Sequence, residues 1–399
     1  MMSGFQTPVH GPVVGSLRTG PFGLRLPGVL LAIGLLLSFA TRGGAETTNN
    51  PPRVRLSEAF GYNQENRSEG PWAVRRVRIR RSRTDLSFHV RLGGGAQLGL
   101  ATLSAQATGV PKSQGRPLAA VNGDYFVRDG AFAGDPEGLC ITEGVLVSLP
   151  SEKSCFWIAP DGSPQCTNVI SLMAVVWPDG TRIPSGLNEA PGDRPVVYTP
   201  EFGDATRTMP GRDLVLVPEQ GTASLAVGEV RGFRLVAVRE GGGTPLLSTN
   251  LVVHLPESLA SRSIPPVGGS VRIDTATLPD LRGVKTALGG GPALLRGGVP
   301  TQLQAGEVRH PRTAIGWNQD DFFLLQVDGR QPSVSVGMSF AEMARTFQEL
   351  GCTEALNLDG GGSSTLWVQG QVANNPSEGG ERPMANSLVV VLGSRGDPN

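Results

Sequence analysis

Short apolar runs separated by glycine and proline dominate this chain of 399 residues. The chain has 55 glycines and 32 prolines, and runs rich in valine, leucine and isoleucine lie between them. Such punctuation is typical of many strands joined by tight turns. The pattern predicts strands at residues 73–79, 87–92, 117–123, 144–149, 155–159, 173–177, 194–199, 213–218, 322–328, 354–359 and 387–392.

One segment instead repeats its apolar residues with a helical period. In SFAEMARTFQELG, Ser339 and Glu342 match a capping box, and Gly351 is placed to end the helix. The helix lies between the strands predicted at 322–328 and 354–359. We therefore predict an α+β fold, a β-rich single domain with mixed sheets, a few helices and a strand-helix-strand unit near the C-terminus. One face of the helix carries Phe340, Met343, Ala344, Phe347 and Leu350.

The N-terminus has the pattern of an export signal. Arg18 and Arg25 precede the apolar run VLLAIGLLLSFA, which is shorter than the roughly 20 residues of a membrane span. We expect cleavage after Ala40 or Ala45, and an uncleaved membrane anchor is the alternative. The expected organisation is a signal peptide or anchor at 1–45, a linker and first strand at 46–79, the main domain at 80–393 and a tail at 394–399. The protein is then periplasmic, envelope-associated or secreted.

Charge and motif content exclude several classes of protein. The 35 lysines and arginines balance the 35 aspartates and glutamates, so no overall basic field attracts nucleic acid. None of the three lysines follows a glycine, which excludes a P-loop, and neither HExxH nor GxSxG occurs. A site must therefore use carboxylates, arginines, amides and backbone N–H groups, and we expect no cofactor and no metal.

The cysteines leave their pairing open. Cys140, Cys155 and Cys166 lie close together in the sequence, and Cys352 lies far from them. An exported chain can carry disulfides, so we expect a pair among the first three cysteines. Four cysteines allow three full connectivities, and the sequence does not choose among them.

Two polar segments lie at the ends of predicted strands in the first half of the chain. AVNGDYF places Asn122, Asp124 and Tyr125 directly after an apolar strand, where a simple turn is the alternative. GDPEGLCITEG places Asp135 and Glu137 before a hairpin, where a surface turn is the favoured interpretation.

Two further segments lie near the C-terminus. His310 and Arg312 flank a proline in VRHPRTAIGW and can present cations to an anion, although a solvated basic loop is the alternative. In ALNLDGGGSSTLWVQG, Asp359 ends a predicted strand and three glycines follow, which let the backbone fold around a bound group. A calcium loop is a further alternative, but this segment supplies one carboxylate where an EF-hand supplies several.

Nine segments in order resemble the phosphodiester glycosidase family, from about residue 80 to residue 393. Bacterial members of this family are often described as exopolysaccharide-related proteins of carbohydrate metabolism. The segments are AVNGDYF, GLCITEG, YTPEFGDATRT, GGGPALL, RHPRTAIGW, VDGR, GMSFAEMARTFQELG, ALNLDGGGSSTLWVQG and ERPMANSLVV.

The resemblance implies hydrolysis of a glycosyl-1-phosphodiester at its anomeric C–O bond, which releases a sugar such as N-acetylglucosamine and a phosphomonoester. Asp359 is the expected catalytic carboxylate, with Asp124 or Glu137 as the second. Arg312 and Arg382, with His310 near them, would hold the phosphate. The further expected substrate-binding residues are Asn122, Asp328, Asn357, Gly360, Gly361, Gly362, Ser363, Ser364 and Asn386.

Two other functions compete with this hypothesis. One is a glycan-binding or exopolysaccharide-assembly protein without turnover, and the other is an ordinary glycoside hydrolase. The expected partner is a phosphodiester-linked carbohydrate, and membrane contact is expected only through an uncleaved N-terminal segment. With only four cysteines, the chain differs from the lysosomal member of the family, so a mannose 6-phosphate product is not expected.

Overall fold

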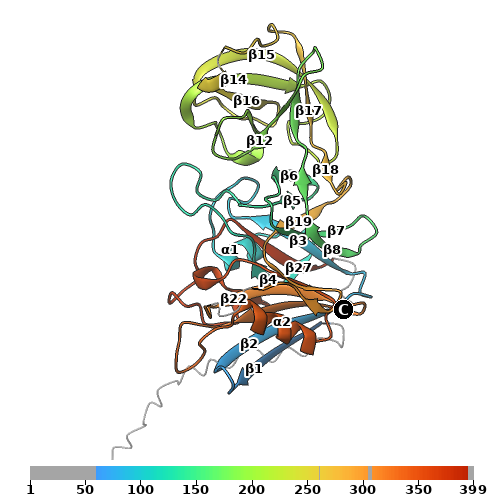
Figure 1. Cartoon of the computed structure of the whole chain (residues 1–399), viewed down its shortest axis with the longest axis vertical. Helices are drawn as coiled ribbons and strands as arrows, with labels where there is room; N and C mark the ends of the chain where they lie inside the picture. Colours follow the sequence, from blue (N-terminus) through green and yellow to red (C-terminus); the bar gives the residue numbers. More distant parts are fainter. Residues whose placement is uncertain (1–59, 260, 304–307, 394–399) are drawn as a thin grey trace, which may run out of the picture. The chain divides into compact units, whose positions relative to one another are not determined.

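Five β-sheets and two α-helices form the part of the chain that the computed structural model describes, which is residues 60–259, 261–303 and 308–393 (Figure 1). The predicted β-rich class with few helices is confirmed. The expected signal peptide or anchor at 1–45 and the expected tail at 394–399 lie outside the described residues. Within the described residues, no helix is long and apolar enough to cross a membrane.

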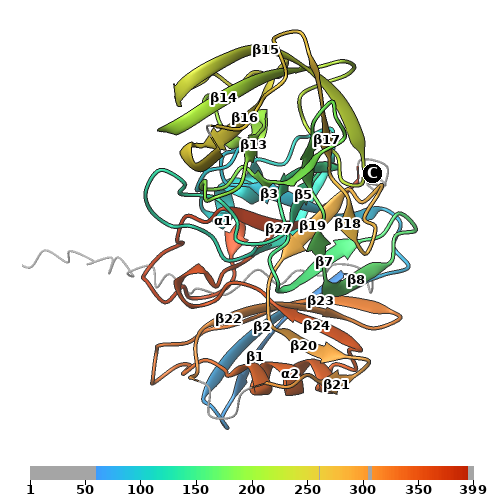
Figure 2. The same cartoon turned by 45° about the horizontal axis from the view of Figure 1, so that its top comes forward.

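A seven-stranded sheet carries helix α2, Phe340–Glu349, on one face (Figure 2). The capping box is confirmed, because the Ser339 side chain accepts from the Glu342 N–H and the Glu342 side chain accepts from the Ser339 N–H. In sequence the helix lies between β23 and β24. The strand order is β1 (Phe60–Arg67), β2 (Trp72–Arg80), β23 (Asp321–Val327), β22 (Arg312–Trp317), β24 (Glu354–Asn357), β20 (Ala293–Arg296) and β21 (Val299–Pro300).

The other face of this sheet packs against a five-stranded sheet. Apolar residues of both sheets, among them Ile315, Leu356, Val121 and Leu388, share one core. Helix α1, Leu103–Thr108, packs in a separate apolar cluster with β4 and β27. The strand order of the five-stranded sheet is β26 (Gln371–Val372), β25 (Leu366–Val368), β4 (Arg116–Asn122), β27 (Asn386–Leu392) and β3 (Leu86–Leu92).

The middle of the chain forms the remaining sheets, which bury the largest apolar cluster. All of their pairings are antiparallel except β12 with β13. A second five-stranded sheet has the order β6 (Val145–Ser148), β5 (Cys140–Thr142), β19 (Thr286–Gly289), β7 (Ser154–Ile158) and β8 (Pro164–Asn168). An eight-stranded sheet has the order β11 (Arg182–Pro184), β10 (Ala174–Val176), β17 (Ser270–Asp274), β15 (Val230–Gly242), β14 (Thr208–Pro218), β16 (Leu251–Pro256), β13 (Val196–Tyr198) and β12 (Gly186–Leu187). Strands β9 (Ile170–Ser171) and β18 (Thr277–Leu278) pair separately.

Each predicted strand overlaps a strand of the structure. The structure differs from the prediction in strands that were not predicted and in where one strand ends. Residues 60–67, expected to be linker, form β1 and pair along their whole length with β2. The longest strand, β15, was missed because arginines and glycines interrupt its apolar residues. The strand predicted at 354–359 ends at Asn357, since the chain turns there into the 3₁₀ helix η3, Gly361–Ser363.

The expected disulfide among the first three cysteines is wrong, because all four cysteines, which lie in the described residues, are buried free thiols. Strand register explains this. Cys166 pairs with Phe156, so the adjacent Cys155 points to the opposite face of the same sheet. Cys140 shares a face with Cys166, but strands β19 and β7 lie between β5 and β8, which puts roughly 14 Å between them. No pair among the three can therefore form a disulfide without moving the sheet.

Candidate active site

Asp359 lies two residues beyond β24, where the chain turns tightly. Its backbone N–H donates to the Gly123 carbonyl at 3.0 Å, and its Oδ1 accepts from the Gly360 N–H at 2.8 Å. Gly361, two residues after Asp359, has a φ of +59°, which a glycine adopts without strain. Burial raises the pKa of Asp359 above its usual value, against the opposing effects of the Ser363 hydroxyl, the Gly360 N–H and the charge of Arg382.

Three carboxylates predicted for the site interact with one another. Burial raises the pKa of Asp124 to about 7, and the charges of Glu137 and Asp359 add to this increase. The charge of Glu137 also raises the pKa of Asp359. The structure therefore brings Asp124, Glu137 and Asp359 into one electrostatic environment. Among the described residues, no group of three or more histidine, cysteine, aspartate or glutamate side chains is arranged to hold a metal ion.

Asp124 and Glu137 differ in access to solvent. Asp124 is 2% exposed, and its Oδ2 lies against the backbones of Gly138 and Gly289. A Cβ at Gly289 would lie 2.0 Å from Oδ2, so the glycine makes room for the carboxylate. Glu137 is exposed and pairs with Lys153 at 2.9 Å. Glu137 and the half-buried Asp359 are thus accessible to a substrate, whereas Asp124 is enclosed by protein.

Asn386 holds Asp124 in place. Its Oδ1 accepts from the Asp124 backbone N–H at 2.9 Å, and its Nδ2 contacts the Cys140 sulfur at 3.7 Å. The Asp124 Oδ1 accepts from the Tyr125 N–H at 2.8 Å, while its Oδ2 has no hydrogen-bond partner among the described residues. Asn386 is buried, and its contacts are those of a positioning residue rather than a ligand for sugar hydroxyls.

Asn122 and Ser364 belong to a buried polar network under the turn that carries Asp359. The Asn122 Nδ2 donates to the Asp359 carbonyl at 2.7 Å, and its Oδ1 accepts from the Thr313 hydroxyl at 2.7 Å. That hydroxyl lies 3.0 Å from the Ser364 Oγ. Asn122 and Ser364 are 1% exposed, so the structure places them where they position the turn.

Asp328 is likewise internal. It is 1% exposed, and its Oδ2 accepts from the Arg75 guanidinium at 2.5 Å. Its Oδ1 accepts from Gln326 at 3.1 Å and from the Asn375 backbone N–H at 3.2 Å. These contacts occupy both oxygens with protein donors, so Asp328 stabilises the end of β23 and is not presented to a substrate.

One of the two cations expected from RHPR, the Arg312 guanidinium, makes its contacts within the protein, and the His310 backbone is fixed by a neighbouring segment. The Arg312 guanidinium lies 3.8 Å from the centroid of the Phe340 ring and donates to the carbonyls of Met338 at 3.0 Å and Val308 at 3.2 Å. The His310 backbone pairs with Met338 through two hydrogen bonds of 3.2 and 3.0 Å. Arg312 is 6% exposed, so these contacts fix the start of β22 and leave little of the guanidinium for a phosphate.

Arg382 and Arg330 lie over the glycines that follow Asp359. Arg382 donates to the Ser363 hydroxyl at 3.2 Å and pairs with Glu378. A Cβ at Gly362 would lie 2.2 Å from the Arg382 guanidinium, and a Cβ at Gly361 would lie 2.9 Å from that of Arg330. Glycines at both positions therefore let two guanidinium groups approach the turn.

Arg330 was missed by sequence reasoning, although it ends the VDGR segment. Its φ of +61° is uncommon for a residue with a side chain and costs of order 1 kcal/mol. Within the described residues it makes no ion pair. The hydrogen bond from Arg382 lowers the pKa of Glu378, and the charges of Arg382, Arg330 and Arg128 act in the same direction. The signal available in the sequence was an arginine directly after the Asp-Gly pair that follows the predicted strand.

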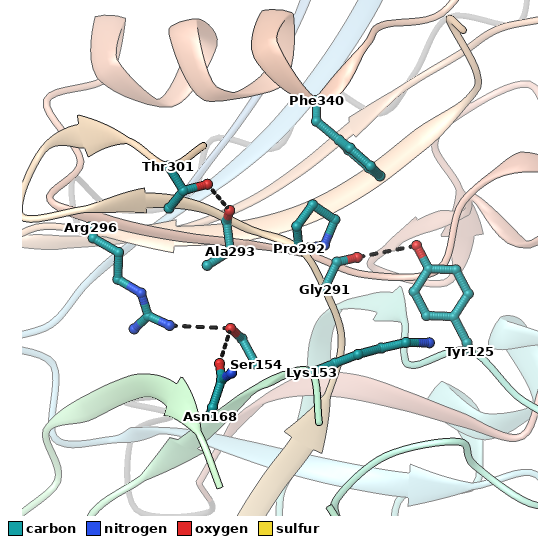
Figure 3. Close-up of a pocket in the computed structure, with 10 residues that line it drawn as sticks. All are labelled: Tyr125, Lys153, Ser154, Asn168, Gly291, Pro292, Ala293, Arg296, Thr301 and Phe340. Carbon is teal, nitrogen blue, oxygen red and sulfur yellow. Dashed lines mark hydrogen bonds between the residues drawn. The ribbon is translucent and has the colours of Figure 1, made fainter. Parts of the chain in front are cut away.

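A pocket of about 590 Å³ lies next to Tyr125, and Figure 3 shows residues that line it. The Tyr125 hydroxyl donates to the Gly291 carbonyl at 3.2 Å and accepts from the Asn357 Nδ2 at 3.1 Å. Asn357 also donates to the Gly291 carbonyl at 2.9 Å, so this buried amide fixes the wall of the pocket rather than lining it. The described lining residues are Tyr125, Lys153, Ser154, Asn168, Gly291, Pro292, Ala293, Arg296, Thr301 and Phe340.

The order of strands puts Asp359 between this pocket and Arg330. Strand β24, which leads to Asp359, has β20 on one side and β22 on the other. The Gly291 N–H, just before β20, donates to the Asn357 carbonyl at 2.8 Å, and the pocket opens on that side. On the other side, the Gly361 N–H donates to the Pro311 carbonyl at 2.8 Å, and β23 beyond β22 leads to Arg330.

Fold and site together define a β-rich protein with a carboxylate just beyond a strand, two arginines at the turn that follows it and a pocket next to that strand. Residues 226–391 match the family model described as phosphodiester glycosidase. The resemblance seen in the sequence is thus confirmed for that segment, which is similar to phosphodiester glycosidases.

The comparisons with the similar proteins below support the fold and say nothing about an activity. An uncharacterized protein, YomE, derived from the SPbeta prophage of Bacillus subtilis (strain 168), is 42% identical over 84 residues, which are 21% of this chain and 13% of that protein. A hypothetical protein from Synechocystis has a TM-score of 0.68 at 20% identity, over 84% of this chain and 62% of that one. A protein from Burkholderia pseudomallei K96243 has a TM-score of 0.62 at 24% identity, over 81% of this chain and 74% of that one.

Proposed function

We propose that the protein hydrolyses glycosyl-1-phosphodiesters at the anomeric C–O bond. The observation that carries this proposal is the position of Asp359, at a turn that the guanidinium groups of Arg330 and Arg382 approach and at the end of the strand next to the pocket beside Tyr125. A carboxylate with cations on one side suits a sugar whose leaving group is a phosphate. The family match supports the same chemistry.

In the proposed reaction the bond between C1 and the phosphate oxygen breaks, and its electron pair leaves with the phosphomonoester. Positive charge develops on the sugar ring, and the Asp359 carboxylate stabilises it. A water oxygen then bonds to C1 and releases one proton. Because the leaving phosphate is already a good acceptor of negative charge, cations help it more than a strong acid does.

Arg382 and Arg330 are the proposed phosphate ligands, in place of Arg312 and His310. Both guanidinium groups flank the glycines after Asp359, whereas Arg312 is occupied by two carbonyls and an aromatic ring. Ser363 keeps its proposed role, since its hydroxyl connects Arg382 to the Asp359 turn.

Glu137 is the proposed second carboxylate at the surface of the site, and it accepts the proton from the attacking water. Asp124 has an indirect role. With a pKa of about 7 it changes charge near neutral pH and thereby alters the field that acts on Asp359. The proposed sugar is N-acetylglucosamine or a related sugar. We also propose that the protein acts outside the cytoplasm, on glycans joined by phosphodiesters.

The test is hydrolysis of a panel of sugar-1-phosphodiesters in water enriched in oxygen-18. We expect free sugar and phosphomonoester, with the heavy oxygen on C1 of the sugar. Heavy oxygen on the phosphate instead would show P–O cleavage and overturn the proposal. Asp359→Asn should abolish turnover while the melting temperature stays within a few degrees of the parent protein.

Two controls separate the competing functions. Binding of the panel without any turnover would show a glycan-binding protein. Equal rates on matched glycosides that lack phosphate, with no loss in Arg330→Gln, would show an ordinary glycoside hydrolase.

A further inference from the structure

The pocket beside Tyr125 has a basic character that cleavage of the phosphodiester does not use. Its described lining residues include two cations, Lys153 and Arg296, and no carboxylate. Figure 3 shows the two cations on different sides of the pocket, with the ring of Phe340 reaching toward it from α2. The walls between them are formed largely by apolar groups, among them Pro292.

The charge of Arg296 is only weakly balanced by the protein. Its guanidinium donates to the Ser154 hydroxyl at 3.2 Å and to the Cys166 carbonyl. The Arg296 guanidinium lies 3.9 Å from the Glu354 carboxylate, which is long for an ion pair. Ser154 is itself fixed by a 2.8 Å hydrogen bond to Asn168, so neutral groups orient the guanidinium and leave its charge available.

The charge of Lys153 is similarly available to a ligand in the pocket. Its Nζ pairs with Glu137 at 2.9 Å, but both side chains are nearly half exposed. Exposed pairs of this kind contribute only about 0 to 1 kcal/mol, so a ligand can share or displace the contact. The Nζ also lies 4.7 Å from the centroid of the Tyr125 ring, which holds it at the mouth of the pocket.

The sheet order sets which part of a substrate would reach this pocket. The proposed phosphate ligand Arg330 follows β23, on the β22 side of Asp359, whereas β20 and the residues just before it line the pocket on the other side. If the scissile bond lies at Asp359 with its phosphate on the arginine side, the sugar points toward Tyr125. A group attached to that sugar then enters the pocket.

We propose that this pocket binds an anionic group, phosphoryl or carboxylate, carried by the sugar that the enzyme releases. The proposal rests on the proposed function, because it takes the position of the sugar from it. The volume of about 590 Å³ lies within the usual range for sites of small ligands, so the pocket has room for a substituent and the carbons that join it to the ring.

The test compares three phosphodiesters with one leaving alcohol: an unsubstituted sugar, the same sugar with a phosphate monoester on another hydroxyl, and the corresponding uronate. We expect kcat/KM at least tenfold higher for one of the two anionic substrates, mainly through a lower KM. Which of them gains identifies the phosphoryl or the carboxylate group as the natural ligand. The gain should shrink as salt concentration rises.

Arg296→Gln should remove most of this gain and leave kcat/KM for the unsubstituted sugar within twofold. Arg296→Lys, which keeps the charge, should retain part of the gain and serves as the second variant if the glutamine variant folds poorly. Arg239→Gln, at an exposed arginine of β15, is the matched control and should change nothing.

The failures are distinguishable. If all three substrates are cleaved with equal kcat/KM and Arg296→Gln alters none of them selectively, the pocket proposal is wrong and the proposed function stands. If none of the three is cleaved at C1, the proposed function is wrong and the pocket proposal falls with it.

Discussion

The side-chain amide of Asn122 donates a hydrogen bond to the backbone carbonyl of Asp359 across 2.7 Å. Asn122 ends β4 and Asp359 follows β24, so this bond connects the ends of strands from two packed sheets. The Asn122 Oδ1 also accepts from the Thr313 hydroxyl and from the Thr365 N–H at 3.1 Å. A single buried amide thus positions the carboxylate on which the proposed chemistry depends.

Asn122→Ala should lower the free energy of unfolding by about 2 to 4 kcal/mol, because it leaves buried donors without an acceptor. It should also lower kcat more than it raises KM, since Asp359 loses its support. Urea unfolding followed by tryptophan fluorescence measures the first effect and steady-state kinetics the second. The exposed Asn63→Ala should change stability by less than about 0.5 kcal/mol. Equal stability of the two variants would contradict the structural role of Asn122.

Asp124 should make stability depend on pH. Its pKa is about 7 in the folded protein and 3.8 in the unfolded reference, so the folded state binds more protons between these values. Stability from this group is therefore present at low pH and is lost as pH rises toward 7. Asp124→Asn should flatten the curve of unfolding free energy against pH in this window and be more stable than the parent protein above pH 7. Parallel curves for the two proteins would show that Asp124 is not held as the structure indicates.

Gly289→Ala should disturb the site through the same carboxylate. A Cβ there would lie 2.0 Å from the Asp124 Oδ2 and 2.9 Å from the Gly138 Cα, so something must move. We expect a loss of about 1 to 3 kcal/mol in the free energy of unfolding, together with reduced turnover. Gly192→Ala, where a Cβ would meet nothing within 4 Å, is the matched control and should cost nothing measurable. Full activity of Gly289→Ala would contradict the close packing around Asp124.

The arginines should separate into binding and structural residues. Arg330→Gln and Arg382→Gln should each lower kcat/KM by about 10- to 100-fold, since each removes a charge-assisted contact to the phosphate. Arg312→Gln should mainly lower the melting temperature, because its guanidinium contacts Phe340 and two backbone carbonyls. A strong loss of activity in Arg312→Gln at unchanged stability, with Arg330→Gln fully active, would reverse this assignment.

The four cysteines should remain thiols. All are buried, and burial raises the pKa of the Cys140 and Cys155 thiols to about 12, which suppresses the reactive thiolate. A thiol reagent should label none of them in the folded protein and all four after unfolding, as measured by intact mass. A mass lower by the two hydrogens of a disulfide would show that the cysteines pair after all.

Local features of this fold were predictable from the sequence. The helix at 340–349 was predicted from a capping box, an apolar stripe and a terminal glycine, and all of these signals act within a few residues of one another. The strand after which Asp359 lies was predicted from its apolar residues and from the glycines that follow. Strand β15 was not predicted, because a long strand of mixed polarity is stabilised by its neighbouring strands and its own sequence has no clear apolar pattern.

The candidate site was predictable as a set of segments but not as a set of side chains. The sequence by itself determined that polar residues gather at the ends of strands, and it included Asp359, Asp124, Glu137 and Arg382 among them. Only the tertiary structure decided that Asp328 pairs with the interior Arg75, that Arg312 stacks on Phe340, and that Arg330 reaches the Asp359 turn. The physical reason is that the direction of a side chain and its burial depend on strand register and on packing between segments far apart in the chain, and a pattern of neighbouring residues specifies neither.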